Sequence, residues 1–144
     1  MILQIKKLRE NAVLPLRATG GSVGYDLCAA LEEPVTLNPG ETKPVPTGLA
    51  MAIPEGYGGF LFARSGLAVK HGIAPANCVG VIDSDYRGEV LIGLHNHGNT
   101  PYTIQPGERV GQLVLLAAAL LEVTECEALE ETQRGAGGFG STGR

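Results

Sequence analysis

Residues 78–94 read CVGVIDSDYRGEVLIGL, in which two short apolar runs flank a polar turn. The runs Cys78–Ile82 and Glu89–Leu94 have the length of strands and are rich in Val, Ile and Leu. The turn between them consists largely of Asp, Ser, Arg and Gly, residues that favour a reversal of the chain. This stretch therefore predicts a β-hairpin.

Similar short runs, bounded by Gly, Pro and Asn, recur along the rest of the chain. They are Leu3–Leu8, Tyr25–Ala29, Glu41–Val45, Leu49–Ile53, Gly59–Phe62, Tyr102–Ile104, Arg109–Leu116 and Leu120–Cys126. About ten short strands at this spacing predict an all-β, jelly-roll-like barrel or sandwich. We expect at most one short helix, capped by Ser65, while residues 113–121 fit either a helix or a strand by pattern alone.

The composition indicates one globular domain. Of the 144 residues 44% are hydrophobic and 18% charged, and 21 glycines and 9 prolines divide the chain into short pieces. We expect residues 1–133 to form a single β domain and residues 134–144 a flexible, glycine-rich arm. A net charge of -4 gives no basic surface for the phosphate backbone of DNA or RNA, so a nucleic-acid polymer is not an expected partner.

Several features that the sequence lacks bear on the location of the protein in the cell and on metal binding. No apolar run has the length of a membrane span and no signal peptide is recognisable, so we expect a cytoplasmic protein without a membrane segment. Cys28, Cys78 and Cys126 are odd in number and widely spaced, which predicts reduced, buried thiols. His95 and His97 share a strand face but have no third ligand nearby, so they are expected to be surface residues.

The predicted hairpin turn carries groups that can perform chemistry. Asp83 and Asp85 supply carboxylates, one of which could act as a general base, and Tyr86 is large for an exposed turn. Asn77, before the first strand, has an amide able to read the edge of a nucleobase. The same composition also suits a solvated turn without function, and both interpretations remain open.

Arg64 and Ser65 lie at the expected start of the short helix. Free N–H groups and the helix dipole attract anions there, so this position is a candidate phosphate site. The alternative is that Ser65 only caps the helix and Arg64 is an ordinary surface residue.

Gln112 stands between apolar neighbours in the run that follows the turn at residues 105–108. Alternation along a strand would place Arg109 and Gly111 on one face and Val110 and Gln112 on the other. Gln112 is then either a core amide bonded to the backbone or part of a site.

The final residues, 134–144, read RGAGGFGSTGR and cannot form a core. Glycines allow successive N–H groups to turn toward an anion, Arg134 supplies a fork for phosphate, and Phe139 offers a face on which a base can stack. Ser141 and Thr142 add hydroxyls. A frayed terminus without function is the alternative.

Five segments taken together resemble the five ordered motifs of the trimeric deoxyuridine triphosphate nucleotidohydrolases (dUTPases). They are Gly24–Leu27, Arg64–Ala68, Gly80–Gly88, Gly107–Gln112 and Arg134–Gly143. The resemblance extends over most of the chain. One departure is Ala63, where many members of the family carry Pro.

The resemblance implies a jelly-roll subunit, a homotrimer with shared sites, Mg²⁺, and hydrolysis of dUTP to dUMP and pyrophosphate by attack of water on the α-phosphorus. It implies that Asp83 and Gln112 are catalytic, Asp83 as the base that activates water. The residues implied to bind base and sugar are Asn77, Gly80, Asp83, Tyr86 and Phe139, and those implied to bind the phosphates are Arg64, Ser65, Gly66, Gln112, Arg134, Ser141 and Thr142. Asp26 would act on the metal indirectly, through water, with Mg²⁺ held mainly by the triphosphate.

Two other functions remain open from the sequence. A deoxycytidine triphosphate deaminase would need acid and base groups at the exocyclic amine, and the turn offers only Asp83 and Asp85. A non-catalytic nucleotide-binding module would be expected if Asp83 or the arm were degraded, and both are intact.

Overall fold

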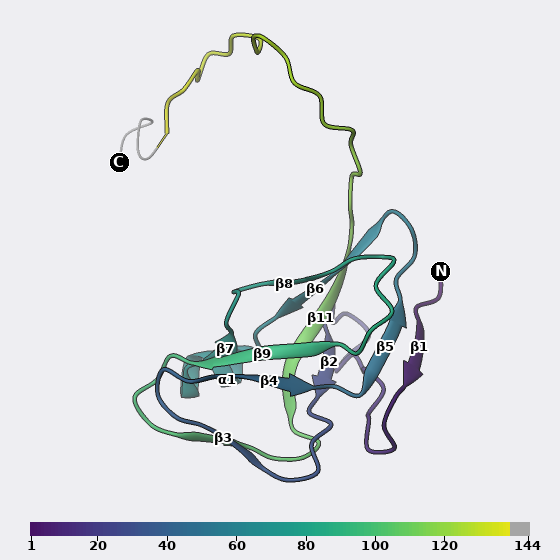
Figure 1. The fold of residues 1–144 in the computed structure, drawn as a ribbon, viewed down its shortest axis with the longest axis vertical. Coiled ribbons are helices and arrows are strands. Elements are labelled where there is room, and N and C mark those ends of the chain that lie inside the picture. The colour runs from purple at the N-terminus through teal and green to yellow at the C-terminus, as the bar shows by residue number, and fades with distance from the viewer. Residues whose placement is uncertain (139–144) are drawn as a thin grey trace.

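The computed structural model describes residues 1–138 and contains eleven strands and one helix in that range (Figure 1). In chain order they are β1 (Gln4–Lys7), β2 (Tyr25–Cys28), β3 (Val35–Leu37), β4 (Thr42–Pro46), β5 (Leu49–Ala52), β6 (Tyr57–Phe62), α1 (Ser65–His71), β7 (Ile73–Pro75), β8 (Gly80–Ile82), β9 (Leu91–Asn96), β10 (Tyr102–Ile104) and β11 (Arg109–Ala117). The predicted all-β, jelly-roll-like class is confirmed.

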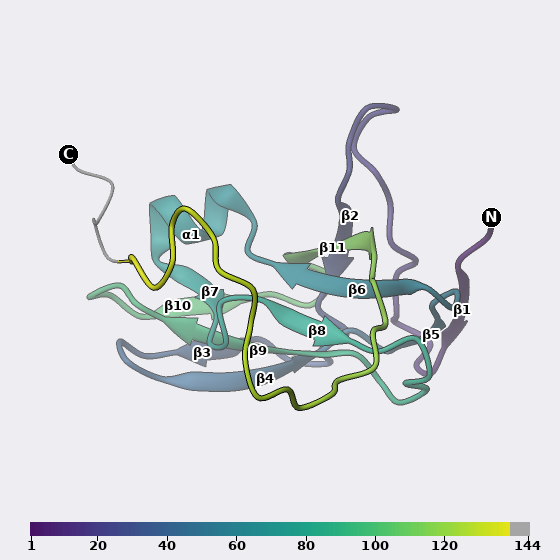
Figure 2. The same cartoon turned by 90° about the horizontal axis from the view of Figure 1, so that it is seen from above.

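The strands form two larger sheets and two small ones. The larger sheets have the orders β2-β11-β6-β8 and β4-β9-β7, and the pairs β1-β5 and β10-β3 complete the set. Every pairing is antiparallel, and most join segments far apart in the sequence, as β2 with β11. Figure 2 shows these layers from above, with α1 next to β7, the strand that it precedes in the chain.

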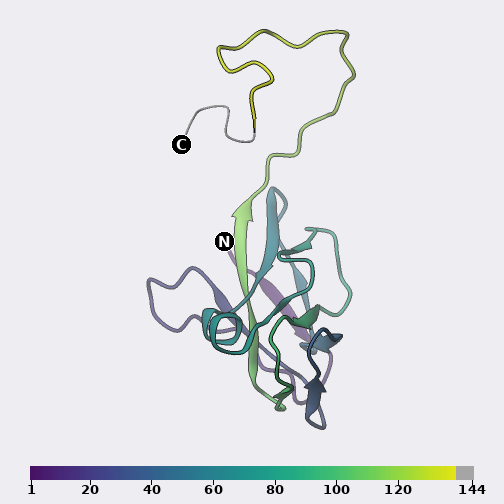
Figure 3. The ribbon, with the colours of Figure 1, turned by 90° about the vertical axis from the view of Figure 1, so that its left-hand side faces the viewer.

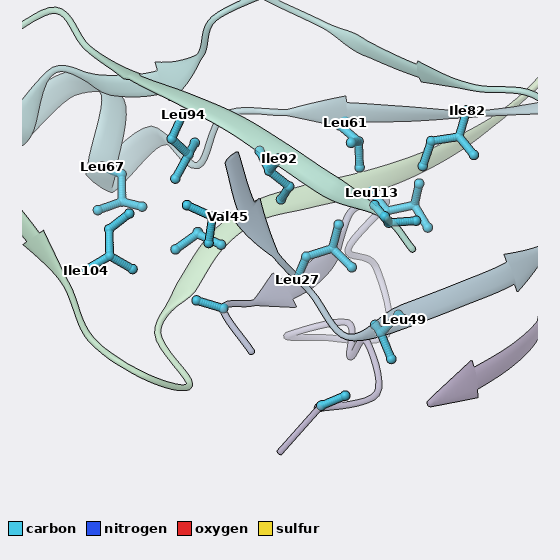
Figure 4. Close-up of a cluster of buried hydrophobic side chains, with 14 of the residues drawn as sticks. Leu27, Val45, Leu49, Leu61, Leu67, Ile82, Ile92, Leu94, Ile104 and Leu113 are labelled. Carbon is cyan, nitrogen blue, oxygen red and sulfur yellow. The ribbon is translucent and has the colours of Figure 1, made fainter. Parts of the chain in front are cut away.

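One apolar core fills the space between the two larger sheets (Figure 4). Leu27, Leu61 and Leu113 come from the four-stranded sheet, and Ile92 and Leu94 come from β9 in the other sheet. These side chains are 0–5% exposed. Alternating apolar residues of the strands thus produce one continuous core, which fixes the loops at its edges.

Helix α1 begins one residue earlier than a cap at Ser65 would require. Arg64 is the N-cap residue, with an extended backbone and no side-chain cap bond, and Ser65 is the first helical residue. The prediction that Ser65 caps the helix is therefore wrong, and its hydroxyl is not engaged at the helix end. Gly72 ends the helix with φ of 70°. Within residues 1–138 no helix is long and apolar enough to cross a membrane.

The two runs of residues 78–94 do form strands, but they do not pair with each other. β8 pairs with β6 in the four-stranded sheet, whereas β9 lies between β4 and β7 in the other. The predicted β-hairpin is therefore wrong in its pairing, because residues 83–90 cross from one sheet to the other. The two strands separate, and space opens between them.

The set of strands differs from the predicted one in two further respects, and one open alternative is settled. β3 and β7 were not expected, since each has only three residues and contains or adjoins turn residues. The stretch 113–121 is resolved as strand up to Ala117. Residues Leu120–Cys126 form no strand, and this segment leads away from the sheets without a partner (Figure 3). Leu121 and Val123 are accordingly 82% and 98% exposed.

β4 contains two prolines, Pro44 within the strand and Pro46 as its last residue. They are tolerated because β4 is an edge strand, paired only with β9.

The three cysteines are free, as predicted, but they are not all buried. Cys28 is partly buried, whereas Cys78 and Cys126 are exposed. The prediction of buried thiols is wrong because Cys78 lies in a turn before β8 and Cys126 in the segment that follows β11.

Candidate functional site

The first pocket lies where β8 and β9 separate, and we call it the β8–β9 pocket. Its volume is about 260 Å³, and its lining includes Asn77, Gly80, Asp83, Tyr86 and Glu89. The structure thus brings together four of the residues predicted to contact base and sugar. Glu89 was not predicted, because a Glu at the start of a strand gives no signal of its own in the sequence.

The loop between β8 and β9 is held by its own hydrogen bonds. The Arg87 guanidinium donates to the Ser84 carbonyl at 2.7 Å and to the Tyr86 carbonyl at 2.8 Å. The Tyr86 N–H donates to the Asp83 carbonyl at 3.2 Å, and the Tyr86 hydroxyl donates to the Glu89 carbonyl at 3.0 Å. The side chains of Asp83 and Tyr86 remain exposed at the mouth of the pocket.

Cys78 has an unusual backbone conformation that shapes both sides of the site. Its φ is 62°, in the left-handed region that residues with a side chain rarely adopt. The turn is closed by hydrogen bonds from Cys78 N–H to the Pro75 carbonyl and from Val79 N–H to the Asn77 carbonyl. Asn77 consequently lines the β8–β9 pocket, while Cys78 lines a second pocket.

The second pocket lies between α1, β2 and β11, and we call it the Arg64 pocket. It has a volume of about 850 Å³. Its lining contains Asp26, Arg64, Ser65, Gly66 and Gln112, which come from three of the five segments singled out in the sequence.

A carboxylate between two guanidinium groups forms the charged centre of the Arg64 pocket. Arg64 Nε donates to Asp26 Oδ1 at 2.9 Å, and Arg109 Nη1 donates to Asp26 Oδ2 at 3.1 Å. Two cations against one anion leave an excess of positive charge, which favours an anionic ligand. The neighbouring Cys28 thiol has a raised pKa, first because of its burial and then because of the Asp26 carboxylate.

Arg109 is a site residue that the sequence pattern did not predict. Its pairing with β2 has a β-bulge between Arg109 and Gly111, so the alternation of faces is interrupted there. Val110 and Leu113 are both in the core, and Arg109 and Gln112 both line the pocket. The expectation that Arg109 and Gln112 face opposite sides is therefore wrong, and only the bulge could have revealed it.

Gln112 is fixed from two sides. In the sheet it lies opposite Asp26 of β2 and Phe62 of β6. Its Nε2 donates to the Ala63 carbonyl at 2.9 Å, at the residue that precedes Arg64. The carboxamide therefore ties β11 to the start of α1 and leaves its oxygen as an acceptor in the pocket.

Arg134 does not reach either pocket. It is exposed in the segment beyond β11, where its Nε donates to the Gly137 carbonyl at 2.9 Å. Phe139, Ser141 and Thr142 lie outside the described residues.

The described residues offer no complete set of protein ligands for Mg²⁺. Residues 1–138 contain no group of three or more His, Cys, Asp or Glu that could hold a metal ion. His95 and His97 contact each other edge to face, and His95 Nδ1 is hydrogen-bonded to the Thr42 hydroxyl. Mg²⁺ commonly keeps several waters and binds one carboxylate together with substrate phosphates, and Asp26 fits that mode because each of its oxygens has a further lone pair.

Together, a polar pocket between separated strands and an arginine-lined pocket in a β-sandwich fold have groups able to bind a small anionic ligand. Comparison with known proteins gives the family. Residues 10–143 match the dUTPase family model. The chain therefore belongs to the dUTPase family.

Curated relatives agree over nearly the whole chain. The deoxyuridine 5'-triphosphate nucleotidohydrolase of Alcanivorax borkumensis is 47% identical over 139 residues, which are 96% of this chain and 93% of that protein. The protein of the same name from Desulfitobacterium hafniense is 51% identical over 131 residues, 90% of this chain and 87% of that protein.

Solved structures show the same fold. The dUTPase of Staphylococcus bacteriophage 80alpha, in a mutant form with dUpNHpp, has a TM-score of 0.91 at 32% identity and covers 99% of both chains. A mutant dUTPase of phage phi11 of S. aureus, a structure concerned with coordination of a structural Mg(II) ion, has a TM-score of 0.82 at 29% identity and covers 91% of this chain and all of its own.

Proposed function

We propose that the protein is a dUTP diphosphatase that hydrolyses dUTP to dUMP and pyrophosphate. The supporting observation is that Asp83 and Tyr86 stand together at the mouth of the β8–β9 pocket in a chain of the dUTPase family. The reaction removes dUTP before it enters DNA and supplies dUMP for thymidylate synthesis.

Uracil would enter the β8–β9 pocket. β8 is an edge strand, so backbone groups on the side away from β6 are available to a base, as is the Asn77 amide. Uracil presents an N–H donor and a carbonyl acceptor where cytosine presents the reverse. A pocket complementary to uracil would leave cytosine with unpaired polar groups, which gives strong discrimination.

Tyr86 and Asp83 would act on the sugar and on water. The Tyr86 ring, placed under the deoxyribose, leaves no room for a 2'-hydroxyl. The Asp83 carboxylate takes a proton from the water that attacks the α-phosphorus and contacts the 3'-hydroxyl. General-base catalysis of this kind contributes about 10²- to 10⁴-fold in rate.

The phosphates would bind in the Arg64 pocket. The guanidinium of Arg64 and the N–H groups of Ser65 and Gly66 would donate to the phosphate oxygens, and Gln112 is held beside them. Mg²⁺, when bound to the triphosphate, would neutralise charge on the phosphate oxygens, and Asp26 would hold it through water.

Residues 134–144 would form an arm over the nucleotide, separate from the domain of residues 1–133. Arg134, Ser141 and Thr142 would add donors to the phosphates, and Phe139 would stack on uracil. Closure of the arm would exclude water from the phosphates.

In a homotrimer, each active site would combine the β8–β9 pocket of one subunit, the Arg64 pocket of a second subunit and the arm of a third. The supporting observation is the unpartnered segment Leu120–Cys126, whose exposed Leu121 and Val123 alternate as in a strand. A neighbouring subunit would supply the missing strand partner. We place the protein in the cytoplasm, where free thiols such as Cys78 remain reduced.

One assay tests this proposal against the two other functions. dUTP, dCTP and UTP are each supplied with Mg²⁺, and release of pyrophosphate and of ammonia is measured. We expect pyrophosphate from dUTP and almost none from UTP. Ammonia from dCTP would instead identify a deaminase, and no product from any nucleotide would indicate a binding module.

The variant Asp83→Asn tests the base. It should lose turnover and retain binding of dUTP, since the amide keeps the size of the side chain but accepts no proton. Unchanged turnover would remove Asp83 from this role.

A further inference from the structure

We infer that Arg9 and Glu89 are positioning residues that hold Tyr86 in place and thereby help to discriminate between deoxyribose and ribose. The inference rests on the proposed function, because it assigns to Tyr86 the contact with the sugar. It extends that function to Arg9, which lies outside all five motif segments and far from the β8–β9 loop in the sequence.

Tyr86 depends on few contacts for its position. Its side chain is 45% exposed, and its hydroxyl donates to the Glu89 carbonyl at 3.0 Å. Its ring also lies against Gly88, where an added Cβ would stand only 2.6 Å from Tyr86 Cζ. The ring is therefore folded back over the residues that lead into β9, and it follows any movement of Glu89.

Glu89 is anchored by a residue of the N-terminal segment, far away in the sequence. Arg9 Nε donates to Glu89 Oε1 at 2.9 Å, and Arg9 Nη2 donates to Oε2 at 3.0 Å. This two-bonded fork is the strongest geometry available to an ion pair of these residues. The Gly48 N–H donates to Glu89 Oε1 at 2.9 Å.

Gly48 joins these contacts to the N-terminal segment. Its carbonyl accepts from the Leu8 N–H at 2.7 Å, next to Arg9. Its φ is 67°, and an added Cβ would stand 2.7 Å from the Ala12 Cβ. The turn therefore requires glycine, which brings a backbone donor to Glu89 where a side chain would not fit.

Hydrogen bonds of the next residue hold the chain around Glu89 independently of the Arg9–Glu89 ion pair. The next residue, Val90, donates its N–H to the Leu49 carbonyl and accepts from the Thr47 hydroxyl. These bonds keep the chain folded when the ion pair is lost, whereas Glu89, whose carbonyl accepts from the Tyr86 hydroxyl, loses the anchor of its side chain and the fit of Tyr86 loosens. The loss should appear in the selectivity for the sugar rather than in folding.

The experiment measures kcat/KM for dUTP and for UTP in the full-length protein and in Arg9→Gln. We expect the dUTP to UTP ratio to fall about three- to fivefold, the range that loss of a partly exposed ion pair allows. Arg9→Lys keeps the charge without the fork and should restore part of the ratio. Lys43→Gln is the matched control, because it breaks a partly exposed ion pair with Glu41, and the bond from Lys43 to the Thr36 carbonyl, away from the pocket, and its ratio should not change.

Repeating the measurement in a Tyr86→Phe variant shows whether the effect of Arg9→Gln on the dUTP to UTP ratio depends on the Tyr86 hydroxyl. In Tyr86→Phe the bond to the Glu89 carbonyl is absent, so adding Arg9→Gln should change the ratio no further. An unchanged ratio in Arg9→Gln, or an equal fall in the Tyr86→Phe background, would overturn the inference while leaving dUTP hydrolysis intact. A wild-type protein that releases no pyrophosphate from dUTP would overturn the proposed function and this inference with it.

Discussion

Gly24 lies against the end of the Gln112 side chain, with no space for a methyl group between them. An added Cβ at Gly24 would overlap the Gln112 carboxamide oxygen and stand 3.2 Å from its Cδ. The clashing group is the flexible end of a side chain, so the protein would fold and Gln112 would move. The amide would then lose its bond to the Ala63 carbonyl.

Gly24→Ala should therefore lower kcat for dUTP by about tenfold, since small displacements of catalytic groups are costly. The melting temperature should change little. Gly21→Ala is a matched control in the same loop, because an added Cβ there meets nothing within 4 Å. Equal activity of the two variants would contradict a role for the position of Gln112.

Arg109→Gln should reduce kcat/KM for dUTP about three- to tenfold. The variant removes one of the two donors to Asp26 and lowers the positive charge of the Arg64 pocket. Stability should be nearly unchanged, because Arg109 is exposed. Arg109→Lys keeps the charge, so a loss as large as in Arg109→Gln would show that the hydrogen bond matters more than the charge.

Cys78→Gly should stabilise the folded protein. Cys78 holds φ of 62°, a conformation that costs a side-chain-bearing residue about 1–2 kcal/mol and glycine almost nothing. Part of this gain is offset by the greater freedom of glycine in the unfolded chain, which leaves about 0.5–1 kcal/mol in the free energy of unfolding. Urea denaturation measures the difference. Cys78→Ser keeps the strain and should show no gain.

The ion pair of Glu89 predicts a pH dependence of stability. The hydrogen bonds from Arg9, followed by that from Gly48 N–H, hold the pKa of the Glu89 carboxyl below its usual value. A carboxyl with a lowered pKa in the folded state stabilises the fold above its unfolded pKa of about 4.3, and the contribution is lost as the pH falls through the folded pKa. The free energies of unfolding of wild type and Glu89→Gln should differ near neutral pH and converge in acid. A constant difference would contradict this assignment.

Deletion of residues 134–144 should leave a folded protein with poor catalysis. Among residues 1–138 the Arg134 side chain is hydrogen-bonded within its own segment, to the Gly137 carbonyl, and it lines neither pocket. Circular dichroism and the melting temperature should match those of the full chain, while turnover of dUTP should fall steeply. Unfolding of the shortened chain would contradict the proposed role of the arm as a lid.

The sequence predicted the elements that local pattern determines. The alternation of apolar residues located most strands, and Asp83, Tyr86 and Asn77 were placed near one another because they belong to a single short stretch. The pattern could not show that β8 and β9 lie in different sheets, since pairing depends on which distant strands compete for each edge. The pocket between them is a consequence of this long-range pairing.

Only some residues of the Arg64 pocket could be predicted from the sequence. Arg64, Ser65 and Gln112 were found because their residue types stand out from their neighbours. Arg109 was missed because the β-bulge at Arg109 and Gly111 changes the face of the strand without a sequence signal. The segment Leu120–Cys126 has the alternation of a strand, but a strand also needs a partner, which residues 1–138 do not provide.

The prolines of β4 limit how copies of the chain can associate. Pro44 and Pro46 are two residues apart, so their nitrogen atoms point to the same side, away from β9. The outer edge of β4 therefore lacks two successive donors and cannot template a strand from another molecule. This edge is protected against aggregation, and any strand that is contributed by a second subunit must add to a different sheet edge.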